Sequence, residues 1–290
     1  MRQILPLKSI RLLSLGLNLP VPAALQRCRQ MGAHCLKFEP PAGDPMQRYE
    51  PQAYLEMHQG IRVQTVDLKT PQGQQQLAQT LAKTDVLLTS FRPSALRKLG
   101  LAWTSLHRRY PQLCQIAVVG APGLAGEAPG HDLTYQAEHD LISGLNLPSS
   151  LYADMGGALM ASEGVLQVLL QRQRQGRGLF LEVALSQAAA WLAAPRRWGL
   201  TQPSGTVGGA HAGYRVYPCR DGRVAVAALE PHFAAALCQA AGLAPQQDPR
   251  RMYQPATQHA LAAFFQTQTR RQLQRLASRQ DIPLHTLSKK

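Results

Sequence analysis

The first half of the chain alternates short apolar runs with stretches of helical periodicity, and this alternation constrains the fold more than any other feature. Strand-like runs occupy residues 10–15, 35–38, 86–90 and 114–119, and helical patterns occupy residues 23–31 and 72–83. Turn residues, among them Gly32, Pro71 and Pro93, separate these segments. Strands that alternate with helices form βαβ units, whose parallel strands make a sheet with helices on both faces. The sequence therefore predicts a doubly wound α/β domain.

The second half completes this large domain and then predicts a smaller α+β domain that begins with a hairpin at Tyr214. A helix is expected over residues 155–173, a strand over 179–183 and a further helix from Ser186 that Pro195 breaks. A glycine-rich stretch then precedes a hairpin over residues 214–229 that turns at Asp221-Gly222, a helix after Pro231 and a basic amphipathic segment over 270–277. We expect a large domain over residues 1–200, a linker over 201–213 and a small domain over 214–290.

Composition and charge limit the class of protein. The chain has 290 residues, 45% of them hydrophobic and 17% charged, which is typical of a globular protein. No apolar run reaches the roughly 20 residues that a membrane-spanning helix needs, and the run over residues 10–21 is interpreted as a buried strand. Five cysteines without a CxxC pair favour a reduced, cytoplasmic setting, with an organelle transit segment as an alternative.

The formal net charge of +14 suits an anionic partner, which could be a nucleic acid, a membrane surface or a polyphosphate ligand. The basic residues are dispersed along the chain, however, and no basic stretch is interleaved with aromatic residues. A solvated basic surface explains most of them. We therefore expect neither a nucleic acid nor a membrane as partner.

Three side chains with acid–base chemistry follow loops or precede helices. His131 ends a loop over residues 120–130 that is dense in glycine and proline, Asp154 stands at the expected N-cap before Met155, and Glu230 precedes Pro231. Deprotonation of a carbon next to a carbonyl needs a base within hydrogen-bond reach, and imidazole titrates near neutral pH. Alternative interpretations are that Asp154 only caps its helix, that Glu230 is a helix N-terminal carboxylate and that His131 is a surface or capping residue.

Several blocks, in this order along the chain, resemble family III CoA-transferases (the CaiB/BaiF family), and among these the α-methylacyl-CoA racemases. The blocks with the most distinctive residues are Met31-Gly32-Ala33, Lys37-Phe38-Glu39-Pro40-Pro41, Val66-Asp67-Leu68-Lys69, Phe91-Arg92-Pro93, Lys98-Leu99-Gly100-Leu101, Gly130-His131-Asp132, Ala153-Asp154-Met155-Gly156-Gly157, Gly176-Arg177-Gly178 and Leu229-Glu230-Pro231.

The resemblance implies a Rossmann-like CoA-binding large domain, a small domain and an interlocked homodimer. It implies that His131 and Asp154 serve the two faces of the α-carbon and that Glu230 fixes the tautomer of the histidine. It assigns the binding of CoA to the cations Lys37, Lys69, Arg92 and Lys98, with Asp132 and Tyr135 beside the pocket. No tightly bound cofactor and no metal are expected, since coenzyme A enters as part of the substrate.

The resemblance leaves three functions open. The first is a racemase that exchanges the α-proton of a 2-methyl-branched acyl-CoA through an enolate. The second is a CoA transferase in which Asp154 attacks the thioester and forms a mixed anhydride. The third is a degenerate, non-catalytic member, because Leu19-Pro20-Val21-Pro22-Ala23 replaces the family's Gly-Pro loop and the chain stops near residues 282–284, where family members usually continue.

Overall fold

The computed structural model describes residues 4–244 and 248–289. The chain forms two compact units, Met1–Ala193 and Ala194–Lys290. The sequence puts the end of the large domain at residue 200, whereas this division falls before the short helix α10 (Ala194–Arg197). Each unit is described by itself below.

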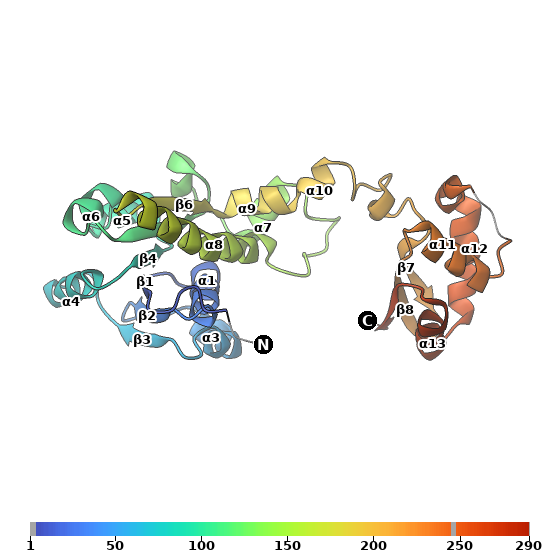
Figure 1. The fold of residues 1–290 in the computed structure, drawn as a ribbon, viewed down its shortest axis with the longest axis horizontal. Helices are drawn as coiled ribbons and strands as arrows, with labels where there is room; N and C mark the ends of the chain where they lie inside the picture. The colour runs from blue at the N-terminus through green and yellow to red at the C-terminus, as the bar shows by residue number, and fades with distance from the viewer. Residues whose placement is uncertain (1–3, 245–247, 290) are drawn as a thin grey trace. The chain divides into compact units, whose positions relative to one another are not determined.

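The first unit contains a six-stranded parallel sheet (Figure 1). Its strand order is β3-β2-β1-β4-β5-β6, which is that of a Rossmann-type doubly wound sheet. The expected strands are confirmed, and one edge strand, β3, is added. The strands are β1 (Arg11–Ser14), β2 (His34–Glu39), β3 (Arg62–Thr65), β4 (Val86–Thr89), β5 (Cys114–Val119) and β6 (Phe180–Ala184).

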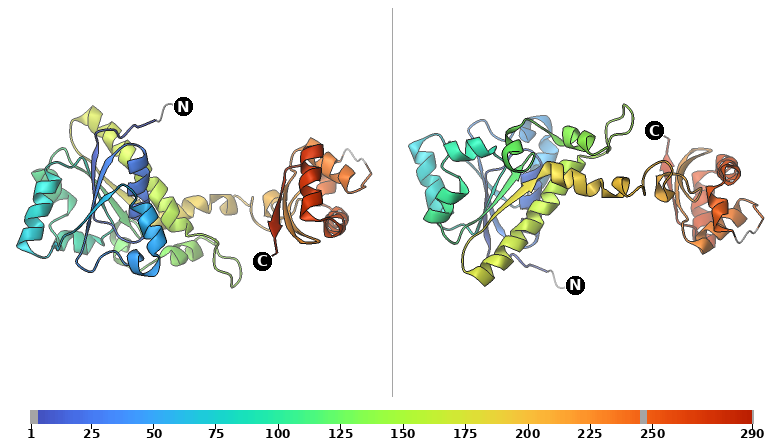
Figure 2. Two further views of the ribbon diagram at one scale, coloured as in Figure 1. Left: turned by 90° about the horizontal axis from the view of Figure 1, so that it is seen from below. Right: turned by 90° about the horizontal axis from the view of Figure 1, so that it is seen from above.

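Helices cover both faces of this sheet because successive strand residues point to opposite sides. Leu12 packs in a cluster with α1 (Pro20–Gln30) and α8 (Tyr152–Gln175), and Leu13 packs in a second cluster with α4 (Pro71–Leu81), α5 (Pro93–Lys98) and α6 (Trp103–Arg109). Figure 2 shows the long helix α8 lying along one face of the sheet. The remaining α-helices of the unit are α2 (Met46–Tyr49), α3 (Pro51–Met57), α7 (Asp132–Glu138) and α9 (Leu185–Leu192).

The strand order reverses between β1 and β4, and such a switch point opens a crevice at the carboxyl ends of the strands. The loops that follow these two strands meet there, since the N–H of Leu17 donates to Ser90 Oγ at 3.4 Å. Val21, which the resemblance aligns with a glycine of the family, lies inside α1 and is fully buried. Gly16 makes room for it, because a Cβ on Gly16 would overlap the Val21 side chain.

The second unit has a three-stranded antiparallel sheet in the order β7-β8-β9, made by β7 (Tyr214–Cys219), β8 (Gly222–Ala227) and β9 (Leu284–Ser288). The predicted hairpin is confirmed, but its turn is Arg220-Asp221, one residue earlier than expected, because Gly222 already pairs with Cys219 as the first residue of β8. The strand β9 was not expected from the sequence. A hydrophobic cluster joins the sheet to α11 (Pro231–Ala240), α12 (Pro255–Thr267) and α13 (Arg270–Gln280).

The five cysteines are free thiols. Over the described ranges, no helix combines the length and the hydropathy that a membrane span requires.

Candidate active site

Asp154 lies in the first turn of α8, two residues after the helix begins at Tyr152. The sequence placed it at the N-cap, and this was wrong, because a carboxylate from another helix caps α8 instead. The backbone N–H of Asp154 donates to Asp132 Oδ1 at 3.0 Å, so the helix does not need a capping side chain of its own at that point. The Asp154 carboxyl group is thereby left available for chemistry.

The Asp154 carboxyl is half-buried, and its acidity is unusual. Burial, and secondly the neighbouring Asp132 carboxylate, raises the pKa of Asp154 from 3.8 to about 6. A carboxyl with a pKa in that range can both accept and return a proton near neutral pH.

Asp132 is a structural acceptor in this unit. It is buried at the start of α7, where one oxygen accepts from Asp154 and the other accepts from the Gln136 side chain. The Gln136 amide also donates to the backbone oxygen of Ser150 at 3.2 Å, which ties the loop before α8 to α7. Asp132 therefore holds the backbone at Asp154 in place, and its expected role beside the CoA pocket stays a prediction. Gln136 was missed in the sequence, although its i, i+4 spacing from Asp132 is visible there.

His131 is the exposed N-cap of α7. Its backbone N–H donates to Thr134 Oγ1 at 3.1 Å, and its backbone oxygen accepts from that hydroxyl at 2.7 Å. Because the next residue, Asp132, contacts Asp154, the structure brings the starts of α7 and α8 together. His131 and Asp154 thus lie at the same corner of the first unit, the helix corner formed by the first turns of α7 and α8.

Tyr135 is buried beside this corner. Burial, and then the Asp154 carboxylate, raises the pKa of its hydroxyl, while Arg92 acts in the opposite direction. The hydroxyl faces the backbone of Gly120 and Gly130, where any side chain would overlap it. Tyr135 and Arg92 therefore belong to the surroundings of Asp154.

The four cations that the resemblance assigned to CoA differ sharply in exposure. Lys69, Arg92 and Lys98 are exposed, Lys69 in the loop after β3 and the other two at the ends of α5. Lys37, in contrast, is 0% exposed, and its ammonium lies 2.6 Å from Asp44 Oδ2 and 2.9 Å from Glu39 Oε1. A phosphate cannot reach it, so Lys37 is removed from the binding residues.

Glu230 lies in the second unit as the exposed N-cap of α11, directly before Pro231. This agrees with the simpler interpretation of a carboxylate at a helix N-terminus. Its expected contact with His131 stays a prediction.

Tyr49 and Asn18 were missed in the sequence. The Tyr49 hydroxyl donates to Asn18 Oδ1 at 3.3 Å, and Asn18 lies in the loop between β1 and α1 at the carboxyl edge of the sheet. Burial, and then the Asp44 and Asp154 carboxylates, raises the pKa of the Tyr49 hydroxyl. Nothing in the local pattern around Tyr49 indicates this position.

The fold and the site together define an α/β protein of Rossmann topology with a proton-accepting carboxylate at the start of a helix. The model of CoA-transferase family III matches residues 7–289, and the chain belongs to this family.

Two curated relatives match about two thirds of the chain. A probable fatty acyl-CoA transferase of Mycobacterium tuberculosis, Rv3272, is 31% identical over 65% of this chain and 52% of its own length. The α-methylacyl-CoA racemase of Mus musculus is 32% identical over 67% of this chain and 55% of its own length. The chain thus spans about half the length of these relatives.

A crystal structure of Rv3272 superposes with a TM-score of 0.84 at 24% identity, covering 97% of this chain and 84% of that one. At that identity the likeness shows the fold alone. Since the curated relatives include both a transferase and a racemase, the family covers both activities.

Proposed function

We propose that this protein exchanges the α-proton of a 2-methyl-branched acyl-CoA, interconverting its two configurations through an enolate. The observation that supports this most is the carboxyl of Asp154, whose pKa lies near 6 at the helix corner that also contains His131. A base with such a pKa is ionised at pH 7 and still holds a proton well enough to return it.

In the proposed reaction, one group removes the α-hydrogen and the other delivers a proton to the opposite face. When Asp154 is the base, its carboxylate takes the proton, the electron pair moves into the thioester carbonyl, and the imidazolium of His131 protonates the carbon. The reverse direction exchanges these roles. The positive end of the α8 dipole lies where negative charge develops, and this favours the enolate.

The CoA portion is proposed to lie over the carboxyl edge of the sheet. Lys69, Arg92 and Lys98 are exposed cations in the loops and helix that follow β3 and β4, and we propose that they supply charge for the phosphates. Glu230 is proposed to hydrogen-bond the far nitrogen of His131 and to fix its tautomer.

The deciding experiment measures deuterium incorporation from D₂O into 2-methylbutanoyl-CoA by mass spectrometry, with no acceptor acid present. We expect incorporation with the unmodified protein and with Glu163→Gln, a matched control because Glu163 is exposed on the same helix. Asp154→Asn and His131→Ala should each lose racemisation and should incorporate deuterium at most into the enantiomer whose α-hydrogen faces the remaining base. Racemisation at the unmodified rate in His131→Ala would refute the two-base mechanism.

A CoA transferase is the second candidate, and the similarity to a probable fatty acyl-CoA transferase favours it. Asp154 would then attack the thioester carbon, expel the CoA thiolate and form a mixed anhydride. Incubation with octanoyl-CoA and hydroxylamine would convert that anhydride to an aspartyl hydroxamate at Asp154, which peptide mass spectrometry detects. Hexanoyl-CoA formed from octanoyl-CoA and hexanoate, with His131→Ala still active, would establish the transferase.

A non-catalytic member is the third candidate. It predicts neither deuterium incorporation nor acyl exchange from the folded protein, and both assays together therefore test it.

We also propose a homodimer. Apolar side chains stand exposed on the first unit along one row of α8, at Met155 and Leu159, and at Trp191 of α9, which is 69% exposed. Leu192 packs against Gly156, so α9 lies close beside this row. Sedimentation should give a dimer that Trp191→Arg dissociates; a monomer at every concentration would exclude it.

A further inference from the structure

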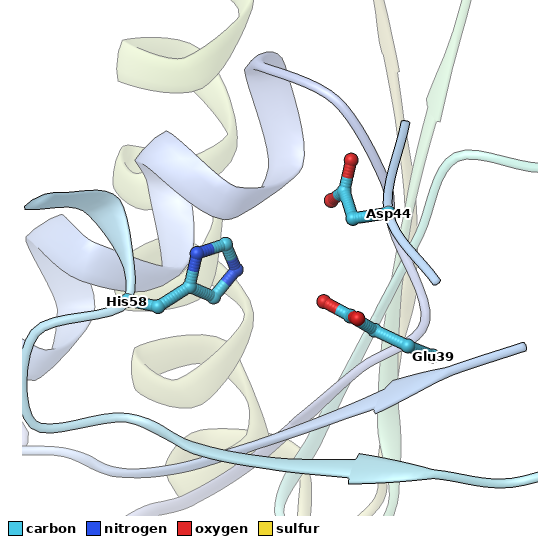
Figure 3. A group of neighbouring side chains, drawn as sticks. All are labelled: Glu39, Asp44 and His58. Atoms are coloured by element: carbon cyan, nitrogen blue, oxygen red, sulfur yellow. The ribbon is translucent and has the colours of Figure 1, made fainter. Parts of the chain in front are cut away.

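Three buried ligand-type side chains converge beneath the carboxyl edge of the sheet (Figure 3). Glu39 ends β2, Asp44 lies in the loop that follows, and His58 is the C-cap residue directly after α3. Their ligand atoms all lie within 4.8 Å of one another, and all three residues are buried. By residue type and spacing, this cluster resembles a metal site.

The ammonium of Lys37 already occupies the centre of the cluster. Lys37 Nζ lies 2.6 Å from Asp44 Oδ2, 2.9 Å from Glu39 Oε1 and 2.9 Å from His58 Nε2. An ammonium has three hydrogens, and these three acceptors satisfy all of them. A metal ion would have to displace the lysine, so the cluster contains its own cation.

His58 fits this arrangement as a neutral acceptor. Its Nδ1 lies 2.6 Å from the backbone oxygen of Tyr54 and donates to it, which leaves Nε2 unprotonated toward Lys37. Burial lowers the pKa of His58 and keeps the ring neutral. The Tyr54 hydroxyl donates to Glu39 at 3.0 Å and offsets part of the remaining negative charge.

Asp44 connects this buried cluster to the surface loop. Besides Lys37, its carboxylate accepts from the backbone N–H of Asn18 at 3.0 and 3.2 Å and from that of Met46 at 3.0 Å. Asn18 has a φ of 62°, a left-handed conformation that needs such support in a residue other than glycine. Its side chain in turn accepts from Tyr49 at 3.3 Å.

This loop lies level with the first turn of α8. Helix α1 follows β1 and α8 precedes β6; because the strands are parallel, both helices run from the carboxyl edge of the sheet toward its amino edge. They pack together, with Arg27 Nε donating to Ser162 Oγ at 3.1 Å. Arg27 is seven residues after the start of α1 at Pro20 and Ser162 is ten residues after the start of α8 at Tyr152. Pro20 therefore stands about level with Met155 in the first turn of α8, and α8 begins about 4.5 Å further toward the carboxyl edge.

We propose that Lys37 is the internal cation of a positioning relay: through Asp44 it fixes Asn18 and Tyr49 against the helix corner that contains Asp154. Lys37, Asp44 and Asn18 are positioning residues in this scheme, and Tyr49 is the side chain they present to the substrate. The part of the proposal that concerns substrate rests on the proposed function. The part that concerns the loop does not.

Amide hydrogen exchange tests the loop directly. In Lys37→Ala, the backbone amides of Asn18 and Met46 should exchange at least about tenfold faster than in the unmodified protein, because their acceptor loses its counter-ion. Lys83→Ala, which removes an exposed lysine, should leave both amides unchanged. Unchanged exchange in a folded Lys37→Ala protein would overturn the relay.

Zinc provides a second readout that does not depend on activity. Lys37→Ala leaves three ligands around an empty centre, so it should bind about one equivalent of Zn²⁺ and recover slow exchange at Asn18. Lys37→Ala/His58→Ala should show no recovery, and the unmodified protein should bind no zinc at this cluster. Exchange that stays fast in the zinc-bound single variant would show that the central charge does not position the loop.

Two substitutions outside the buried cluster, at the half-buried Asn18 and the exposed Tyr49, keep the test open if Lys37→Ala fails to fold. Asn18→Gly retains the left-handed backbone and Tyr49→Phe removes the hydroxyl, so each breaks the same hydrogen bond. Each should lower kcat by about 10- to 100-fold with little change in KM, and the double variant should be no worse than either single one. Equal kinetics, or additive losses, would refute the positioning role.

The outcomes separate the two proposals. If the unmodified protein catalyses neither reaction while the exchange and zinc results are as expected, the relay stands and the proposed function fails.

Discussion

Replacing Asp154 by asparagine should stabilise the protein at pH 8 while it abolishes activity. The reason is the direction of the pKa shift. Burial and the Asp132 carboxylate raise the pKa of Asp154 from 3.8 to about 6, which means that the folded state holds the proton more tightly than the unfolded state.

The sign and size follow from linkage. Below pH 3.8 both states are protonated; as the pH rises toward 6 the unfolded state ionises first, and folding becomes less favourable until both have ionised. A shift of about two units corresponds to about 3 kcal/mol at about 1.4 kcal/mol per unit. Since the carboxyl is only half-buried, solvent screening reduces this to about 1–2 kcal/mol.

Asparagine has the same shape and does not ionise, so it recovers this free energy of unfolding at pH 8. Thermal unfolding should show a Tm about 2–8 °C higher for Asp154→Asn at pH 8. The gain should shrink as the pH is lowered from 6 toward 4, because the unmodified carboxyl then becomes protonated. Glu163→Gln, on the exposed side of α8, should leave the Tm unchanged at both pH values.

A lower Tm for Asp154→Asn at pH 8 would refute the reasoning. It would show that the folded protein stabilises the Asp154 carboxylate, in which case the residue would be a poor acid and its pKa would lie below 3.8.

The remaining predictions concern pH and the packing of Tyr135. If Asp154 is one of two bases, kcat/KM should rise as the pH increases through about 6, where its carboxyl ionises, as measured by chiral analysis across the pH range. Both enantiomers should give the same profile, because the ratio of their kcat/KM values equals the equilibrium constant of the racemisation, which does not depend on pH; a profile that is flat through pH 6 would contradict this. Gly120→Ala should lower the free energy of unfolding by about 1–3 kcal/mol, measured by denaturant unfolding, because the added methyl overlaps the Tyr135 hydroxyl. Adding Tyr135→Phe to this variant removes the hydroxyl and should largely restore the stability. Tyr135→Phe should not rescue Gly130→Ala, since there the methyl would also lie 2.7 Å from ring atom Cζ; equal rescue at both glycines would refute this packing.

The strands and helices of the first unit were predictable because their signals are local. Leu12 and Leu13 both belong to an apolar run between turn residues, and such a run forms a strand buried on both faces. The edge strand β3 was missed because its residues are half-buried or exposed and show no apolar run. Likewise, β9 pairs with β8 from the far end of the chain, which no local pattern indicates.

The ordered blocks were enough to identify the family and to single out Asp154. They could not distinguish Lys37 from Lys69, since each is a lysine at or just after a strand. In the folded protein one is fully buried among Glu39, Asp44 and His58 and the other is exposed. The difference depends on the helix α3 and on the loop around Asp44, which pack over β2 but not over the loop after β3.

The sequence by itself therefore determined the doubly wound sheet, the family and the residue types at the site. Tertiary structure decided where α8 begins, what Asp132 holds, how acidic Asp154 is and which lysine is hidden. The physical reason is the separation along the chain over which each kind of interaction acts. Periodicity and turn chemistry act between neighbouring residues, whereas desolvation and charge interactions depend on which distant segments exclude water from a group.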